Sequence, residues 1–546
     1  MPDYAGVWPP KPHDTAYDDY GVYSSWWAGD TLALQTIYSN ANYLIPTPRP
    51  SQLRGGVVGM LSRLWWGRPV LQDTKRLHVP APADIATTSA DLLFGQPPSW
   101  LFDADDATDV EGAQDRLNDL FDDADTVATF LEAAEIQAAL GGVFLRLWWD
   151  NTASNKVMVS AVAPDGAIPV WQYGRLREVT FWTIVGKDAQ GTWRHLEHHE
   201  AGRIEHALYV GDDASIGRRM PLTDQEATAW AADLVDENSG IDTGVDGLTA
   251  AYVPNVRPAR KWRNVPQLSA LGRSDFEGVE PLFDALDEAW SSWMRDLDIA
   301  KGRLFVAQEL LEDQGPGKGA SWDPEQQIFT PVPSDGMSLN DEQGSRLVQA
   351  QQFEIRVEEH NKTCEKLLKQ ILRACGYSSA DFDDSDAAAM TATEVSARKN
   401  KSNETRSRKI LYWQANVQPL ATTALKLDAI VYGDGRDYGL SADPEMKFPV
   451  RVDQDPVSLS TAISNLRNAR AVSTETAVRM FNPNWSNDEV QEEVERILKE
   501  DAMEQQPTLP SEFDNPVAAD TSATDPGADD SMNDSGSSDA AETQLR

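Results

Sequence analysis

The amino-acid sequence predicts an α+β protein built around long helices. Apolar residues recur every three or four positions in two long segments, 274–303 and 345–376, and a third long helix is expected from about 392 to 432. Between 143 and 210 the pattern changes to short β-type runs separated by turn residues. The chain has 546 residues, of which 41% are hydrophobic, so it is long enough for about three or four domains with sizeable cores.

The N-terminal part of the chain is expected to hold an extended arm followed by helices. Residues 1–52 are aromatic, polar and rich in proline, and we expect them to form an arm with one short helix near 31–42. The spacing of apolar residues then predicts a helix over 84–95, ending at Gly95, and another over 124–140.

The segment 143–210 is expected to form a compact antiparallel sheet. Its predicted strands are 143–149, 157–163, 177–185, 191–197 and 203–210, with turns at Pro164-Asp165-Gly166 and Ala201-Gly202. Residues 211–270 are acidic and show no regular period, so we expect irregular structure there.

Two long amphipathic helices flank a short insert. The first begins with Ser274-Asp275-Phe276-Glu277, in which a hydroxyl and a carboxylate are placed to satisfy free helix N–H groups. The insert, 304–344, contains strand-like and turn-like residues, including Gly315-Pro316-Gly317. An ordinary helical hairpin inside a large core would give the same pattern.

The C-terminal part is predicted to be helical and to end in a disordered tail. An acidic loop, 377–391, precedes the third long helix, which ends at Gly433. Pro419 should kink that helix, because proline lacks a backbone donor and clashes with the preceding turn. Residues 456–503 are expected to form a small helical domain, and 504–546 are too polar and acidic to fold.

The charge of the chain argues against a non-specific nucleic-acid binder. Its net charge is −39, whereas such a binder needs a basic face to displace the counterions of phosphate. The protein therefore either has no nucleic-acid partner or lets nucleic acid pass without holding it. The two cysteines, Cys364 and Cys375, lie too far apart along one helix for a disulfide, which suits a reducing cytosol. We expect neither a signal peptide nor a membrane span.

The candidate motifs for cofactors and metals lack required residues or the required spacing. Gly315–Ser321 resembles a phosphate loop, but glycine follows Lys318 where a hydroxyl residue is needed. His195, His198, His199 and His206 lack zinc-ligand spacing, so a solvated hairpin is favoured over a metal site. We therefore expect no cofactor and no metal. A glycosidase with a pair of catalytic carboxylates remains an alternative, since the eighteen tryptophans would suit stacking on sugar rings.

The order of these segments resembles that of tailed-bacteriophage portal proteins, in detail the SPP1-like siphophage family. Five short stretches carry the resemblance: Ala90–Pro98 (ADLLFGQPP), Ala138–Arg146 (AALGGVFLR), Ser274–Val279, Thr391–Val395 and Val472–Thr476. Each stretch is weak alone, but their order covers about 50 to 503. The first fifty residues and 211–270 match no part of the family pattern.

The resemblance implies a non-enzymatic ring of about twelve copies at one capsid vertex, with double-stranded DNA threading its centre. It divides the chain into an N-terminal arm (1–52), a wing (53–273 and 392–455), two stem helices (274–303 and 345–376), a clip (304–344), a tunnel loop (377–391), a crown (456–503) and an acidic tail (504–546). Implied partners are the terminase large subunit, the head–tail connector or adaptor, and the major capsid protein. The acidic tail either recruits a scaffold protein or has no role. The implied location is the virion, with assembly in the host cytoplasm.

Three groups of residues are candidates for function under this resemblance. The tunnel-loop aspartates Asp381, Asp383, Asp384 and Asp386 should repel phosphate and keep DNA centred and mobile. The basic cluster Arg398, Lys399, Lys401, Arg406, Arg408 and Lys409 should pair with a neighbouring subunit, or else contact DNA directly. Clip residues Trp322, Ile328, Phe329 and Pro331 should anchor a partner or pack against the next clip. Two alternative functions remain, another oligomeric virion component or adaptor and a soluble carbohydrate-active enzyme.

Overall fold

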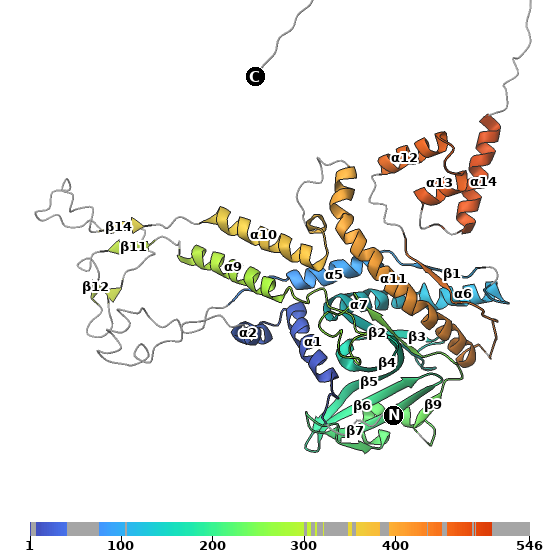
Figure 1. The fold of residues 1–546 in the computed structure, drawn as a ribbon, viewed down its shortest axis with the longest axis horizontal. Coiled ribbons are helices and arrows are strands. Elements are labelled where there is room, and N and C mark those ends of the chain that lie inside the picture. The colour runs from blue at the N-terminus through green and yellow to red at the C-terminus, as the bar shows by residue number, and fades with distance from the viewer. Residues whose placement is uncertain are drawn as a thin grey trace, which may run out of the picture. The chain divides into compact units, whose positions relative to one another are not determined.

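The computed structural model describes residues 1, 7–40, 76–103, 106–237, 239–299, 303–306, 312–313, 320–321, 348–351, 356–382, 392–433, 435–449, 456–482, 485 and 487–504. The chain divides into two compact units, residues 1–462 and residues 463–546. The first contains the sheets and the long helices, and the second is a small group of helices (Figure 1).

The N-terminal segment is helical and belongs to the core, so the prediction of an extended arm is wrong for this part, whereas the short helix predicted near 31–42 is confirmed. Helix α1 covers His13–Ala28 and α2 covers Thr31–Asn40. One face of α1 buries Ala16, Tyr20, Tyr23 and Trp26, which recur at helical spacing. This helix could not be predicted from the sequence, because the apolar residues of its buried face are mostly aromatic and prolines precede it.

Of the next three helices, α5 and α7 lie close to the predicted positions, whereas α6 was not predicted. Helix α5 covers Ala81–Phe94 and stops at Gly95, α6 covers Val110–Phe121, and α7 covers Ala124–Leu140. Gly141 ends α7 with a φ of 86°, in the left-handed region. A Cβ at Gly141 would lie 2.7 Å from the backbone nitrogen of Ser274, so only glycine allows this close approach.

Two antiparallel sheets follow α7. The smaller has the order β10-β2-β3, formed by Ala250–Pro254, Gly142–Trp148 and Met158–Val162. The larger has the order β4-β5-β6-β7-β8, formed by Ala167–Gln172, Arg175–Asp188, Gly191–Glu200, Arg203–Gly211 and Arg218–Met220, and β9 (Gly240–Asp242) also pairs with β7. A two-stranded ribbon joins β1 (Ser99–Leu101) to β15 (Glu445–Lys447). The predicted antiparallel sheet region is confirmed.

The prediction of irregular structure for 211–270 is wrong. This segment supplies β8, β9, β10 and the short helix α8 (Glu226–Ala232). All five residues of β10 are buried, so the strand lacks the alternation of polar and apolar residues that would have revealed it. Strand β10 pairs with β2 in the register Tyr252 to Phe144.

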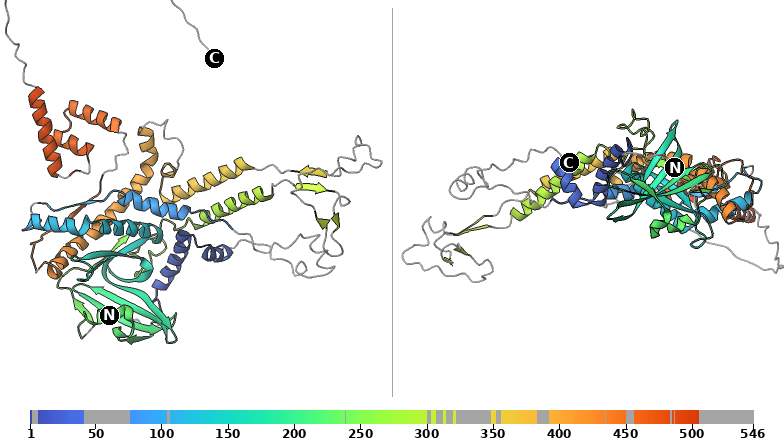
Figure 2. Two further views of the ribbon diagram at one scale, coloured as in Figure 1. Left: turned by 180° about the vertical axis from the view of Figure 1, so that it is seen from behind. Right: turned by 90° about the horizontal axis from the view of Figure 1, so that it is seen from below.

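The two long helices form a side-by-side pair that extends away from the sheets (Figure 1 and Figure 2). Helix α9 covers Glu280–Ile299 and α10 covers Val357–Cys375. Both begin later than predicted, because Ser274 forms turns and bonds to other elements, while Val348–Gln351 is a strand (β14) paired with β11 (Arg303–Val306). A second small ribbon pairs β12 (Glu312–Asp313) with β13 (Ala320–Ser321).

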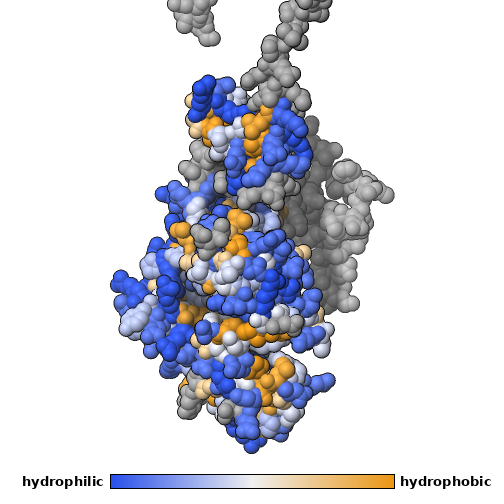
Figure 3. Space-filling model, turned by 90° about the vertical axis from the view of Figure 1, so that its right-hand side faces the viewer, coloured by the Kyte–Doolittle hydropathy of each residue, from blue (hydrophilic) through white to orange (hydrophobic). Residues whose placement is uncertain are grey.

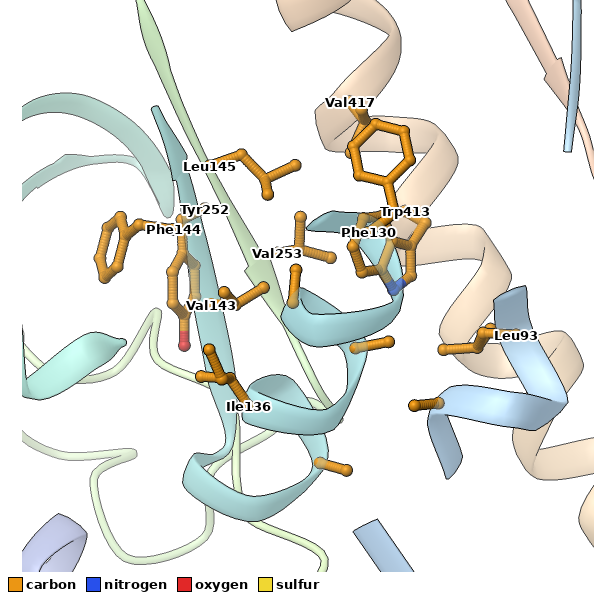
Figure 4. Packing of buried hydrophobic residues seen from close by; sticks show 14 of the residues in the cluster. Leu93, Phe130, Ile136, Val143, Phe144, Leu145, Tyr252, Val253, Trp413 and Val417 are labelled. Carbon is orange, nitrogen blue, oxygen red and sulfur yellow. The ribbon is translucent and has the colours of Figure 1, made fainter. Parts of the chain in front are cut away.

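Helix α11 (Ala392–Val431) crosses the body of the first unit and contains Pro419, as predicted. Its residue Trp413 is fully buried and meets Phe130 of α7 edge-on, with ring centroids 5.8 Å apart. Figure 4 shows Trp413 and Val417 directed toward Phe130, while Val143 and Val253 of the smaller sheet lie on the other side of α7. The core thus joins α11, α7 and the smaller sheet.

The segment 456–503, predicted to be a small helical domain, contains three helices among its described residues. Helix α12 (Pro456–Asn468) runs across the boundary between the units, and α13 (Thr474–Phe481) and α14 (Asn487–Glu504) follow it. Ser473 caps α13, since its hydroxyl accepts a hydrogen bond of 3.1 Å from the Thr476 amide.

Candidate functional site at the base of the paired helices

The outer parts of α9 and α10 are joined by charged and aromatic side chains. The Asp296 carboxylate bonds to the guanidinium of Arg356 at 2.7 Å and to Nε2 of His360 at 2.9 Å. The ring of Trp293 stacks on His360 with centroids 6.0 Å apart and an interplanar angle of 5°. These contacts join the last turns of α9 to the start of α10 and so hold the two helices together at their outer end.

The first half of α9 is fixed to the N-terminal region through Asp287, which is 1% exposed. Its carboxylate accepts hydrogen bonds from the Tyr38 hydroxyl at 2.5 Å and from the Val79 amide at 2.8 Å, and it contacts Nδ1 of His78 at 2.9 Å. One turn earlier on α9, Asp284 pairs with Arg76 at 2.7 Å. The sequence marks Asp284 and Asp287 only as part of a helix pattern, so this clamp could not be predicted.

A buried ion pair lies where α9, α10, α11 and α5 meet. The Lys409 ammonium bonds to Asp275 at 2.8 Å, to the Ser89 hydroxyl at 2.7 Å and to the Tyr377 hydroxyl at 3.0 Å. All three donors of the ammonium are therefore satisfied. The side chains of Lys409 and Asp275 are 1% and 4% exposed. Burial lowers the pKa of Lys409, and Asp275 opposes this shift.

Asp275 connects this ion pair to further elements. Its second carboxylate oxygen accepts a hydrogen bond from the side-chain amide of Asn255 at 2.7 Å. The backbone amide of Asp275 donates to the carbonyl of Ala138. The Tyr377 hydroxyl also donates to Asp275, at 2.7 Å, and burial raises its pKa well above the usual value. The segment before α9, the segment after α10 and the middle of α11 thus share one hydrogen-bonded network.

The chain that leaves α10 is bonded to one face of α11. The Thr405 hydroxyl donates to the Gly376 carbonyl at 2.6 Å, and the Ser402 hydroxyl accepts from the Ser378 amide at 2.8 Å. Ser402 also donates to the carboxylate of Asp381. Ser402, Thr405 and Lys409 are all buried and recur at helical spacing, so they form a polar stripe along α11.

These contacts place the first of the predicted tunnel-loop aspartates. Asp381 ends the short helix η5 (Ser379–Asp381), and its carboxylate is bonded within its own chain. Asp383, Asp384 and Asp386 lie outside the described residues.

The predicted basic cluster does not stay together. Lys401 and Arg408 are exposed on α11, and only the backbone of Arg398 and Lys399 is described. Arg406 bonds to the carbonyls of Leu92 at 2.6 Å and Pro449 at 2.9 Å. Lys409 is buried, so the expectation that it faces a neighbour or DNA is wrong: a buried acidic partner draws it inward. The clip residues Trp322, Ile328, Phe329 and Pro331 lie outside the described residues.

The four clustered histidines are buried, which corrects the expectation of a solvated hairpin. His195 and His206 stack with ring centroids 5.3 Å apart, and His199 contacts Glu197 at 2.7 Å and Thr249 at 2.6 Å. Burial lowers the pKa of His206 to about 4. Across the part of the chain that the structure describes, no three His, Cys, Asp or Glu side chains are placed to hold a metal ion.

The described surface is mostly hydrophilic on the face shown in Figure 3, with hydrophobic residues in separate patches. Among the helices of the described ranges, none is both long enough and apolar enough to cross a membrane.

Comparisons with known proteins identify a family for most of the chain. A family model described as "Phage portal protein, SPP1 Gp6-like" matches residues 70–507, more than half of the chain. A search of curated proteins finds no match. Among solved structures, the chain is similar to the neck of a native GTA particle computed with C12 symmetry, at 14% identity and a TM-score of 0.36, covering 82% of this chain and 98% of that one. It is also similar to the neck of an empty GTA particle computed with C6 symmetry, at 14% identity and a TM-score of 0.37, covering 75% and 92%.

Proposed function

The chain belongs to the SPP1 Gp6-like family of phage portal proteins, and we propose that about twelve copies form a closed ring through which double-stranded DNA enters and leaves a capsid. The ring would lie at one vertex of the virion and would be assembled in the host cytoplasm. It would act without catalysis or a cofactor, because the energy for packaging would come from a separate terminase.

The family match across 70–507 is the observation that carries this proposal. The paired helices α9 and α10 support it, because a closed ring needs one rigid element per subunit that repeats around the axis. The Asp287 clamp and the buried Lys409–Asp275 pair fix the base of this element to the body. A head-to-tail interface closes into a ring only if each copy presents the same geometry to the next.

Each region of the chain would form a different part of the ring. The sheets, α5, α7 and α11 would form the wing, α9 and α10 the stem, and the segment 304–344 the clip that meets the terminase large subunit and later the head–tail connector. The segment 377–391 would approach the DNA as the tunnel loop, and α12–α14 would form the crown. The major capsid protein would surround the wing.

Light scattering of the purified full chain tests the ring. We expect a particle of about twelve 60.3 kDa chains, and negative-stain images with a central hole. Deletion of 383–386, which leaves the bonded residues up to Asp381 in place, should preserve the ring and impair DNA packaging. A monomer or dimer at micromolar concentration would contradict the proposal.

A further inference from the structure

Helix α10 carries a straight line of positive charges on its exposed face. Lys362, Lys366, Lys369 and Arg373 are all exposed and recur at steps of four, three and four residues. With 3.6 residues per turn, this spacing places the four side chains in one row parallel to the helix axis. The row spans about 16 Å from the first to the last Cα.

This row lies opposite the side of α10 that packs into the protein. The buried residues of the helix are Cys364, Ile371, Leu372 and Cys375. At about 100° per residue, they cluster on the side facing away from the basic row. The four cations therefore point outward from the α9–α10 pair, and they stand out in a chain with 48 basic and 87 acidic residues.

Three of the four cations have no partner among the described residues. Lys362 pairs with Glu358 at 2.9 Å, one turn earlier on the same helix. Within the described ranges, Lys366, Lys369 and Arg373 form no ion pair or hydrogen bond through their side chains. A row of unpaired cations is complementary to a partner with regularly spaced negative charges.

We propose that this basic row of α10 contacts the phosphate backbone of double-stranded DNA, an inference that rests on the proposed portal function. Double-stranded DNA presents one negative charge per about 1.7 Å of its axis, so a row of about 16 Å meets several phosphates. Exposed lysines make flexible point-charge contacts, so the DNA exchanges one contact for the next as it moves. The row thus holds the DNA only transiently and does not fix its position.

The other partner with negative charge would be α9 of a neighbouring copy, but its carboxylates are already used. Asp284 and Glu288 pair with Arg76 at 2.7 and 3.5 Å. Asp287 pairs with His78, and Asp296 pairs with Arg356. Among the carboxylates whose side chains the structure describes on α9, only Glu280 has no ion pair, and it is half-buried. The carboxylates described on α9 thus form no complementary row.

The test is a triple variant of the full chain, Lys366→Gln, Lys369→Gln and Arg373→Gln. The matched control, Arg175→Gln, Lys187→Gln and Arg218→Gln, removes the same charge from exposed positions of the larger sheet. Binding to a linear double-stranded DNA fragment of mixed sequence is measured by fluorescence anisotropy over a range of salt concentrations, and assembly is measured by light scattering.

We expect the α10 variant to form the same particle as the unchanged protein but to bind DNA more weakly. The slope of log affinity against log salt should become shallower by about 0.9 for each phosphate that the row no longer neutralises. Loss of the particle would assign the row to a neighbouring copy and overturn the proposal. A salt slope equal to that of the control would also overturn it. If the unchanged protein forms no ring, the portal function fails, yet the comparison of the two salt slopes still tests the row.

Discussion

Substitution of Lys409 by methionine tests whether the buried ion pair holds the base of the paired helices. Methionine has a similar length and is apolar, so the variant removes the ammonium without leaving a large cavity. Asp275, with a side chain only 4% exposed, would then lose its ammonium partner. Breaking a buried pair in this way costs about 3–5 kcal/mol, because the remaining buried carboxylate has lost its opposite charge.

The free energy of unfolding is measured by urea titration followed by circular dichroism. We expect Lys409→Met to lower it by about 3–5 kcal/mol, and the exposed neighbour Arg408→Met to change it by less than about 0.5 kcal/mol. Adding Asp275→Asn to Lys409→Met should recover part of the loss, because the buried charge is then removed. A loss below about 1 kcal/mol for Lys409→Met would refute the reasoning, since the carboxylate would then need no ammonium.

Three further predictions follow from the other contacts. Asp287→Ala should lower the free energy of unfolding by about 1–3 kcal/mol, because it leaves the partly buried Val79 amide without its acceptor, whereas Glu288→Ala on the exposed side of the same turn should change it little. Ser402→Ala should raise hydrogen exchange in the peptide covering 372–382 by about five- to tenfold, since the Ser378 amide loses its acceptor, while Ser402→Thr and the exposed control Ser407→Ala should leave it unchanged. Burial lowers the pKa of His206 to about 4, so the folded protein holds this imidazole neutral. The resulting stability is fully present above about pH 6.5 and is lost as the pH falls toward 4. The urea midpoint of the His206→Gln variant should therefore depend less on pH in that range than the midpoint of the unchanged protein.

The elements predicted correctly have clear start and stop signals. Helix α7 could be bounded because its apolar residues keep one period until Gly141, and α11 because the pattern persists until Gly433. Three strands of the larger sheet, β5, β6 and β7, were visible through their turns, whereas β4, β8 and β9 were missed. Helix α1 was missed because its buried face is made of Tyr and Trp, and β10 because a strand buried on both sides shows no alternation.

The site was harder to predict than the fold, because burial depends on distant parts of the chain. Lys409 stands among other basic residues in the sequence, and nothing local distinguishes it from Arg408, which is exposed. Its partner Asp275 lies 134 residues earlier. The basic row of α10 is different: its spacing is visible in the sequence, but it becomes a distinct surface only once the opposite face is known to be buried.

The basic row of α10 depends on the buried Lys409–Asp275 ion pair for its orientation. A row of cations meets DNA in the same way in every copy only if each α10 keeps one orientation relative to the body. Tyr377, which follows α10 closely, bonds to both Asp275 and Lys409, and so fixes the rotation of the helix at its C-terminal end. Arg373 lies one turn from this point and should be the best-positioned cation of the row. Lys409→Met should therefore weaken DNA binding at the row as well as stability, even under conditions in which the variant remains folded and assembled.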